Sequence, residues 1–367
     1  MVTWDRAMRC VAALGLVGCP SPEEGNEETD TEGSSSGSTD ASGVTVSGGA
    51  SASSASASAG SSSNGTTTEQ STSSTTSTTD ASSGSTGTEE TTGIGCGADV
   101  LEPGRHEGLV LEFDGLERTY DLLVPASYDA STPTTLVLNF HGYLIGNPMQ
   151  QAEWSQMDGF AEDAGVVVAY PAGVNASWNG GQCCGDAMSG DIDDVGFVRA
   201  LVEHISGMLC IDPDRVFATG MSNGGFLSHR LACEAGDLVA AIAPVAGVLG
   251  VDTAGCEGRA VPVMHFHGTS DLIVGYNGGI FTSVADTMSF WVEHNGCGAE
   301  PDVTFQMGDT TCETWSGCTD GADVVLCTIE GGGHCWPGNT ACPVMSSTDQ
   351  IHASEAALQF FADHPMP

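Results

Sequence analysis

Twelve residues near the middle of the chain decide its fold, and they read Arg215-Val216-Phe217-Ala218-Thr219-Gly220-Met221-Ser222-Asn223-Gly224-Gly225-Phe226. A β-rich run ends at Thr219, the pattern G-x-S-x-G follows, and a helical pattern begins directly after it. This order predicts a sharp strand-to-helix turn that exposes Ser222 as a nucleophile at the helix start. Glycines flank the serine because a Cβ there would collide with the neighbouring strand and helix.

Strand and helix patterns alternate on both sides of this turn. Short β-rich runs lie at Tyr120–Val124, Thr135–Phe140, Val166–Tyr170, Arg215–Thr219, Val239–Val245 and Val261–Phe266, and helical patterns lie at Asp193–Cys210, Phe226–Glu234, Ser283–His294 and Asp349–Asp363. Near-continuous apolar runs are typical of strands buried on both faces. The alternation therefore predicts an α/β fold, a mostly parallel central sheet with helices on both faces. The Cys-rich residues 296–330 contain two further short runs and indicate an antiparallel edge.

Composition divides the chain into three zones. Residues 1–19 carry a short apolar run that ends in Cys19 and resembles a bacterial lipoprotein signal, with an ordinary signal peptide as the alternative. Residues 20–93 are rich in Ser and Thr and predict a disordered linker. Residues 94–367 form one folded domain. We expect an exported protein, lipid-anchored through Cys19 at the outer membrane or cell surface, or secreted.

Charge and cysteine content agree with export. The chain has 48 acidic and 8 basic residues, a net charge of −40, which argues against nucleic acid as a partner. It has 14 cysteines, and all but Cys10 and Cys19 lie in the folded domain, which predicts a disulfide-stabilised domain made in an oxidising compartment. We expect the adjacent Cys183 and Cys184 to belong to two separate disulfides, with a redox pair formed by the two residues as the alternative. A bridge between Cys335 and Cys342 is a further hypothesis.

A serine hydroxyl needs a base and a group that orients the base. In this architecture both follow the serine in the chain, each after a later strand. Asp271 follows the run Val261–Phe266, and His334 follows a run at Val324–Ile329 within a glycine-rich loop. The expected roles are Ser222 as nucleophile, His334 as general base and Asp271 as its orienting acid. Asp252 and Asp302 are fallback acids.

An anion that develops on the substrate needs backbone N–H donors. One is expected from Asn223, and the second from Tyr143 or Gly142 in the loop after a buried strand. His141, Trp178 and Trp336 are candidate substrate-binding residues; for the two tryptophans, a place in the core is the alternative. His265 and His267 alternate on one strand, but no third ligand lies at a suitable spacing, so no metal is expected.

These motifs together resemble a known family. They are His141-Gly142, Tyr170-Pro171-Ala172-Gly173, Trp178-Asn179-Gly180-Gly181 with Cys183-Cys184-Gly185, Asp193-Asp194-Val195-Gly196-Phe197, Gly220-Met221-Ser222-Asn223-Gly224-Gly225, His267-Gly268-Thr269-Ser270-Asp271 and Gly332-Gly333-His334-Cys335-Trp336-Pro337-Gly338. The family groups polyhydroxybutyrate depolymerase-like proteins with feruloyl and acetyl xylan esterases. The resemblance implies an α/β-hydrolase fold, a triad at Ser222, Asp271 and His334, and ester hydrolysis without a cofactor. It also implies that the 178–185 loop and Trp336 lie near the mouth of the site.

Three functions follow from the resemblance as alternatives. The leading expectation is a serine carboxylesterase that removes feruloyl or acetyl side chains from xylan through an acyl-enzyme. The second is a polyhydroxyalkanoate depolymerase. The third is a non-catalytic surface binding protein on a hydrolase scaffold. In each enzymatic case the partner is an ester linked to a polysaccharide or polymer.

Overall fold

The structure is a computed structural model that describes residues 96–97, 101–144, 146–256, 258–342 and 345–367. The expected signal peptide, Cys19 and the linker at 20–93 lie outside the described residues and stay predictions. None of the described helices has the length and apolar character needed to cross a bilayer.

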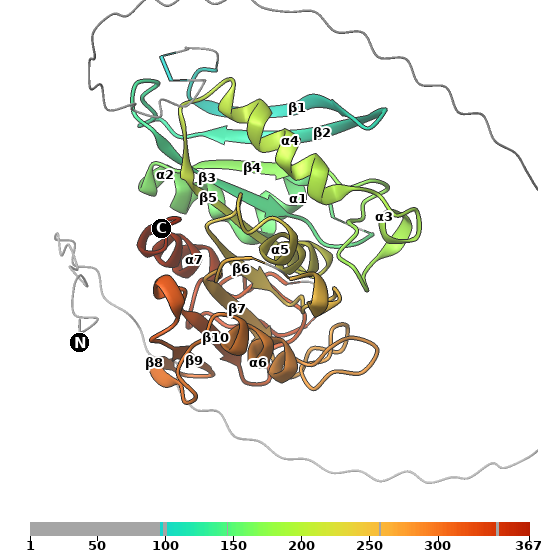
Figure 1. Cartoon of the computed structure of the whole chain (residues 1–367), viewed down its shortest axis with the longest axis vertical. Coiled ribbons are helices and arrows are strands. Elements are labelled where there is room, and N and C mark those ends of the chain that lie inside the picture. Colours follow the sequence, from blue (N-terminus) through green and yellow to red (C-terminus); the bar gives the residue numbers. More distant parts are fainter. Residues whose placement is uncertain (1–95, 98–100, 145, 257, 343–344) are drawn as a thin grey trace, which may run out of the picture. The chain divides into compact units, whose positions relative to one another are not determined.

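One 10-stranded sheet runs through the domain in the order β1-β2-β4-β3-β5-β6-β7-β10-β9-β8 (Figure 1). Its strands are β1 (Gly104–Phe113), β2 (Leu116–Val124), β3 (Thr134–Phe140), β4 (Val167–Pro171), β5 (Ile211–Met221), β6 (Ala241–Val245), β7 (Val263–Gly268), β8 (Asp302–Met307), β9 (Thr310–Trp315) and β10 (Val324–Ile329). The six central strands, in the spatial order β4-β3-β5-β6-β7-β10, run parallel to one another. The outer strands pair antiparallel at both ends. The predicted mostly parallel sheet and its antiparallel edge are confirmed.

Helices cover both faces of this sheet. They are α1 (Pro148–Ser155), α2 (Met157–Ala164), α3 (Gly185–Ser189), α4 (Asp194–Ser206), α5 (Asn223–Glu234), α6 (Val284–His294) and α7 (Ala353–Asp363), with short 3₁₀ turns at Thr253–Gly255 and Thr319–Gly321. Two separate hydrophobic clusters result. One cluster contains Leu138 of β3 with side chains of α4, α5 and α6, and the other contains the adjacent Val137 with α1, α2 and α7. Successive side chains of a strand point to opposite faces, so buried strands contribute to both clusters.

Several elements differ from the sequence expectation. The edge strand β1 was not predicted because it is mostly exposed and lacks a continuous apolar run. The helices α1 and α2 are only eight residues each and are separated by Gln156 in a left-handed conformation, which leaves too short an apolar period to recognise. The helix predicted from Asp349 begins instead at Ala353.

Six disulfides join the described cysteines: Cys96–Cys210, Cys183–Cys184, Cys233–Cys256, Cys297–Cys318, Cys312–Cys327 and Cys335–Cys342. The proposed bridge between Cys335 and Cys342 is confirmed. The expectation for Cys183 and Cys184 was wrong, because the two residues pair with each other. Every other described cysteine is already paired elsewhere, so neither has a separate partner.

Candidate active site

Ser222 occupies the turn between β5, which ends at Met221, and α5, which begins at Asn223. Its backbone has φ 56° and ψ −120°, a conformation that L-residues rarely adopt. A Cβ on Gly220 would lie 2.7 Å from the Phe140 carbonyl oxygen, and one on Gly224 would overlap the same carbonyl. The strand–turn–helix geometry predicted from the sequence is therefore present, and its glycines allow the close approach of β3.

Asp271 and His334 meet at the carboxyl ends of β7 and β10. The Asp271 Oδ2 atom lies 2.7 Å from Nδ1 of His334, while its Oδ1 accepts hydrogen bonds from the N–H groups of Ile273 and Val274. Burial alone would raise the pKa of Asp271, but hydrogen bonds from His267 and His334 hold it below its usual value. A carboxylate only accepts hydrogen bonds, so Nδ1 of His334 carries its proton and Nε2 is left as a proton acceptor.

Ser222 and His334 line the same cavity. Within the described residues the Ser222 hydroxyl makes no hydrogen bond. The hydrogen bond between a nucleophile and its base is often long or poorly aligned before substrate binds. The evidence that Ser222 and His334 act together is therefore the cavity that both residues line. All three residues expected to form a triad thus belong to one site, two of them through a direct hydrogen bond.

The backbone donors expected for a developing anion lie beside Ser222. Asn223 is the first residue of α5, so its N–H has no acceptor within the helix. The N–H of Tyr143 has no acceptor among the described residues, and Tyr143 lines the cavity next to Gly142. A Cβ on Gly142 would lie 3.4 Å from Cβ of Ser222, which brings this loop to the nucleophile. Two N–H groups without a backbone acceptor therefore lie near Ser222, one at the start of α5 and one in the loop that carries Gly142.

His141 does not line the cavity, which corrects its assignment as a substrate-binding residue. Its side chain is 1 % exposed, its Nε2 accepts the N–H of Gly173, and its Nδ1 donates to the Gly142 carbonyl. Burial lowers the pKa of His141 to about 4. The imidazole is therefore a neutral brace that holds the loop carrying Gly142.

Trp178 is also corrected, because it is fully buried and does not reach the cavity. Its ring packs 5.3 Å from that of Phe140, and its backbone N–H and carbonyl are both bound by the side-chain amide of Asn223. Trp178 is thus a core residue that ties the 178–185 loop to the helix start beside Ser222. Trp336, in contrast, lines the cavity, with its indole N–H donating to Ser354.

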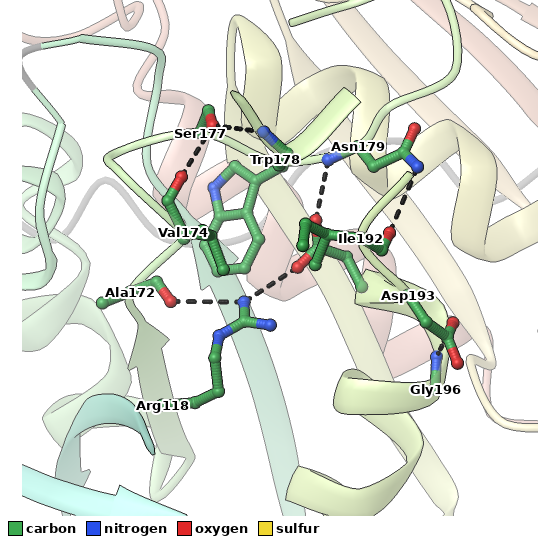
Figure 2. A network of polar contacts seen from close by, with 12 residues as sticks. Arg118, Ala172, Val174, Ser177, Trp178, Asn179, Ile192, Asp193 and Gly196 are labelled. Carbon is green, nitrogen blue, oxygen red and sulfur yellow. Dashed lines mark hydrogen bonds and ion pairs between the residues drawn. The ribbon is translucent and has the colours of Figure 1, made fainter. Parts of the chain in front are cut away.

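A buried ion pair supports the 178–185 loop, and Figure 2 shows its cation, Arg118, together with Asn179 of the loop. Arg118 of β2 donates to Asp194 at the start of α4 over 2.8 Å, and the other oxygen of Asp194 accepts the N–H of Asn179 over 2.7 Å. Burial raises the pKa of Asp194, an effect that its pairing with Arg118 opposes. The guanidinium also lies over the ring of Phe197 at 3.8 Å. The motif Asp193-Asp194 is therefore structural, since it fixes the loop that contacts Asn223.

The cavity measures about 440 Å³ and is lined mainly by apolar side chains. Besides Ser222, His334 and the backbone of Gly142, its walls include Tyr143, Leu144, Trp154, Cys183, Cys184, Met221, Ile273, Val274, Ile280, Phe281, Trp336, Asn339 and Cys342. Most of these wall residues were missed from the sequence, since they come from loops and from α1 without any shared motif. This volume is within the range of small-molecule sites.

The remaining candidates lie elsewhere. Asp252 caps a 3₁₀ turn through the N–H of Ala254, and Asp302 begins the edge strand β8, so neither fallback acid meets the imidazole. His265 and His267 do share one side of β7, where they hydrogen-bond each other over 3.0 Å. Among the described residues no group of three or more His, Cys, Asp or Glu side chains could hold a metal ion.

Known proteins similar to this chain include several esterases, although no family model matches it. Feruloyl esterase D of Neurospora crassa is 30 % identical over 260 residues, which cover 65 % of this chain and 81 % of that protein. A putative esterase of Nocardia uniformis is 31 % identical over 256 residues, covering 62 % of this chain and 73 % of that protein.

Another relative matches a smaller part of its own length. Feruloyl esterase B of Piromyces equi is 34 % identical over 228 residues, 57 % of this chain, and the match spans 41 % of that longer protein. Among solved structures, an acetyl xylan esterase from Aspergillus awamori aligns with a TM-score of 0.49 at 16 % identity, covering 67 % of this chain and 94 % of that one.

Proposed function

The chain belongs to the family of esterases that contains the feruloyl esterases, and from that premise we propose that it hydrolyses aromatic acyl esters through Ser222, His334 and Asp271. The observation that carries the proposal is the 2.7 Å contact between His334 and Asp271 at a cavity that also contains Ser222 in a strained turn. The link to polyhydroxybutyrate depolymerases has no support among these relatives.

In the proposed mechanism the Ser222 oxygen attacks the ester carbonyl while Nε2 of His334 takes the hydroxyl proton. The imidazolium that forms is stabilised by the Asp271 carboxylate, whose lowered pKa keeps it ionised at neutral pH. The backbone N–H groups of Asn223 and Tyr143 stabilise the oxyanion. His334 then protonates the leaving alcohol, which gives an acyl-enzyme. His334 then deprotonates a water molecule, which attacks the acyl carbonyl. The bond to the Ser222 oxygen breaks, the carboxylic acid leaves, and Ser222 regains its proton from His334.

The proposed acyl group is aromatic, because an acetyl group would fill only a small part of the cavity. Trp336, Phe281 and Val274 are large apolar wall residues that suit the ring of a hydroxycinnamoyl group. Burying such a ring removes apolar surface from water, with roughly 25 cal/mol gained per Å². This gain would favour feruloyl over acetyl esters.

A water-insoluble polyester is the second candidate, favoured by the rim of the same cavity. The side chains of Leu144 and Ile280 line the cavity and are 69 % and 86 % exposed. Exposed apolar side chains beside a binding site are typical of surfaces that contact an apolar partner. A polyhydroxyalkanoate would offer such a surface together with ester bonds.

Export is supported by the disulfides, since six bridges would persist only in an oxidising compartment. Cys96 is bonded to Cys210 at the amino end of β5, whereas Ser222 follows the carboxyl end of that strand. The 11 residues of β5 separate the two ends by roughly 33 Å. Cys96 therefore lies near the end of β5 that is remote from Ser222. Loss of lipid labelling in Cys19→Ser tests the proposed anchor.

The proposed function is tested with the purified full chain on four substrates: a p-nitrophenyl ester, feruloylated xylan, acetylated xylan and polyhydroxybutyrate. We expect release of ferulate with a higher kcat/KM than release of acetate. Ser222→Ala should lose turnover of all esters, while Ser189→Ala, a change at an exposed serine, should retain it. Equal rates for Ser222→Ala and the wild type would refute the triad. A preference for acetate would refute the aromatic acyl group and leave the triad intact.

A further inference from the structure

Three buried histidines continue the hydrogen bonding of Asp271 into the core. His267 and His265 lie on β7, and His229 lies on α5. Nε2 of His265 is 3.0 Å from Nδ1 of His267, and Nε2 of His229 is 3.3 Å from Nδ1 of His265. At the inner end, the indole N–H of Trp291 on α6 lies 3.0 Å from Nδ1 of His229. All three imidazoles are 0–1 % exposed.

The two ends of this row determine where every proton sits. An indole N–H only donates, so Nδ1 of His229 accepts and its Nε2 must donate to His265. The same reasoning gives His265 a protonated Nε2 that donates to Nδ1 of His267. At the outer end, Nε2 of His267 faces only acceptors, the Val274 carbonyl at 2.8 Å and Oδ2 of Asp271 at 3.4 Å. Both ends therefore require the neutral Nε2–H tautomer in all three rings.

Burial keeps the two inner rings of the row, His229 and His265, neutral. Burial lowers the pKa of His229 to about 3 and holds the pKa of His265 well below its usual value. Each ring stacks or tilts against its neighbour, with centroids 5.4 Å apart between His229 and His265 and 5.3 Å apart between His265 and His267. A chain of hydrogen bonds that all point the same way is mutually polarised, which strengthens the last donor.

At its outer end the row closes a ring around the acid loop. His267 donates to the Val274 carbonyl, the Val274 N–H donates to Oδ1 of Asp271, and Oδ2 of Asp271 lies within 3.4 Å of His267. Rotation of the carboxylate away from His334 would break this ring. This ring of hydrogen bonds therefore keeps Oδ2 of Asp271 directed toward Nδ1 of His334.

We propose that His267, His265 and His229 form a directional imidazole relay whose role is to position Asp271, with Trp291 setting its inner end. The inference rests on the proposed function, since Asp271 matters to turnover only if His334 acts as the base. None of the three histidines lines the cavity, so they are positioning residues that act through Asp271.

The first experiment reads the tautomers directly, without any activity. Full-length protein labelled with ¹⁵N at histidine is studied by long-range ¹H–¹⁵N correlation spectra at pH 7, with assignments from single His→Gln variants. We expect His229, His265 and His267 to be neutral with the proton on Nε2, and His334 to carry its proton on Nδ1. A proton on Nδ1 of any relay histidine would overturn the proposal.

The second experiment breaks the relay and measures turnover. His267→Phe removes the donor to the loop that carries Asp271. We expect kcat to fall about tenfold, which corresponds to an increase of about 1.4 kcal/mol in the activation free energy. The concentration of active sites is measured by titration with an organophosphate, so that misfolded protein does not count. His267→Gln supplies an N–H at nearly the same place and should recover kcat to within about threefold. Trp315→Phe, a conservative change at a tryptophan outside the relay, serves as the matched control.

The results separate the two proposals. A kcat for His267→Phe within twofold of the wild type would overturn the relay and leave the triad in place. If His267→Phe fails to fold, the same comparison is made with His265→Gln and His265→Asn, since only Gln extends far enough to bridge His229 and His267. Equal loss in both would overturn the relay. Activity that persists in Ser222→Ala would instead refute the proposed function, whatever the tautomers are.

Discussion

Mild acid should destabilise this protein strongly, because three of its buried histidines fold in the neutral form. The pKa of His141 is lowered to about 4 and that of His229 to about 3, and the pKa of His265 is also depressed. A histidine has a pKa near 6.5 in the unfolded chain. Below pH 6.5 the unfolded state therefore binds protons that the folded state does not, so stability falls as the pH falls.

The size of the effect follows from the number of protons. Each histidine that is charged when unfolded and neutral when folded contributes ~1.4 kcal/mol per pH unit. Three of them give about 4 kcal/mol between pH 6 and pH 5, where most carboxylates have not begun to titrate. The stability of a domain is commonly about 5–15 kcal/mol, so this is a large share. Asp271, with its lowered pKa, adds a further loss only below the unfolded value near 4.

The measurement is the free energy of unfolding from guanidinium titrations at half-unit pH steps from 7 to 5. We expect a slope near 4 kcal/mol per pH unit below pH 6, reduced by about 1.4 kcal/mol per pH unit in His229→Gln. Ser189→Ala, a change at an exposed residue without a titratable group, should keep the full slope. A wild-type slope below about 1.4 kcal/mol per pH unit would refute the neutral burial of these rings.

Three further outcomes test the site and its support. Asp271→Asn should lower kcat about 10⁴-fold because an amide favours the wrong imidazole tautomer, and a wild-type pH–rate profile in this variant would contradict the assigned role. Gly224→Ala should destabilise the fold by about 3 kcal/mol through its overlap with β3, whereas Gly159→Ala, in open space on α2, should stabilise it by about 0.5 kcal/mol in the same thermal unfolding assay. Arg118→Met should cost about 3–5 kcal/mol by leaving Asp194 unpaired, and adding Asp194→Asn should recover part of the loss; no recovery would argue against the ion pair.

The sequence alone predicted the parallel sheet and the turn at Ser222. These features depend on short stretches of sequence, since the strand and helix periods repeat within about ten residues and a tight turn requires a pattern of glycines. It also predicted that Asp271 and His334 would meet, because the carboxyl ends of parallel strands share one edge of a sheet. The 2.7 Å contact between them agrees with that prediction.

Only the tertiary structure distinguished Trp178 from Trp336. Both lie in glycine-rich loops and both are buried, at 0 % and 2 % exposure, yet only Trp336 lines the cavity. The direction in which a loop side chain points depends on what distant segments pack against it, here the Asn223 amide and the ring of Phe140. The same holds for the relay, because His229 reaches His265 only when α5 packs on the neighbouring strands β5 and β6, an arrangement that no local sequence pattern predicts.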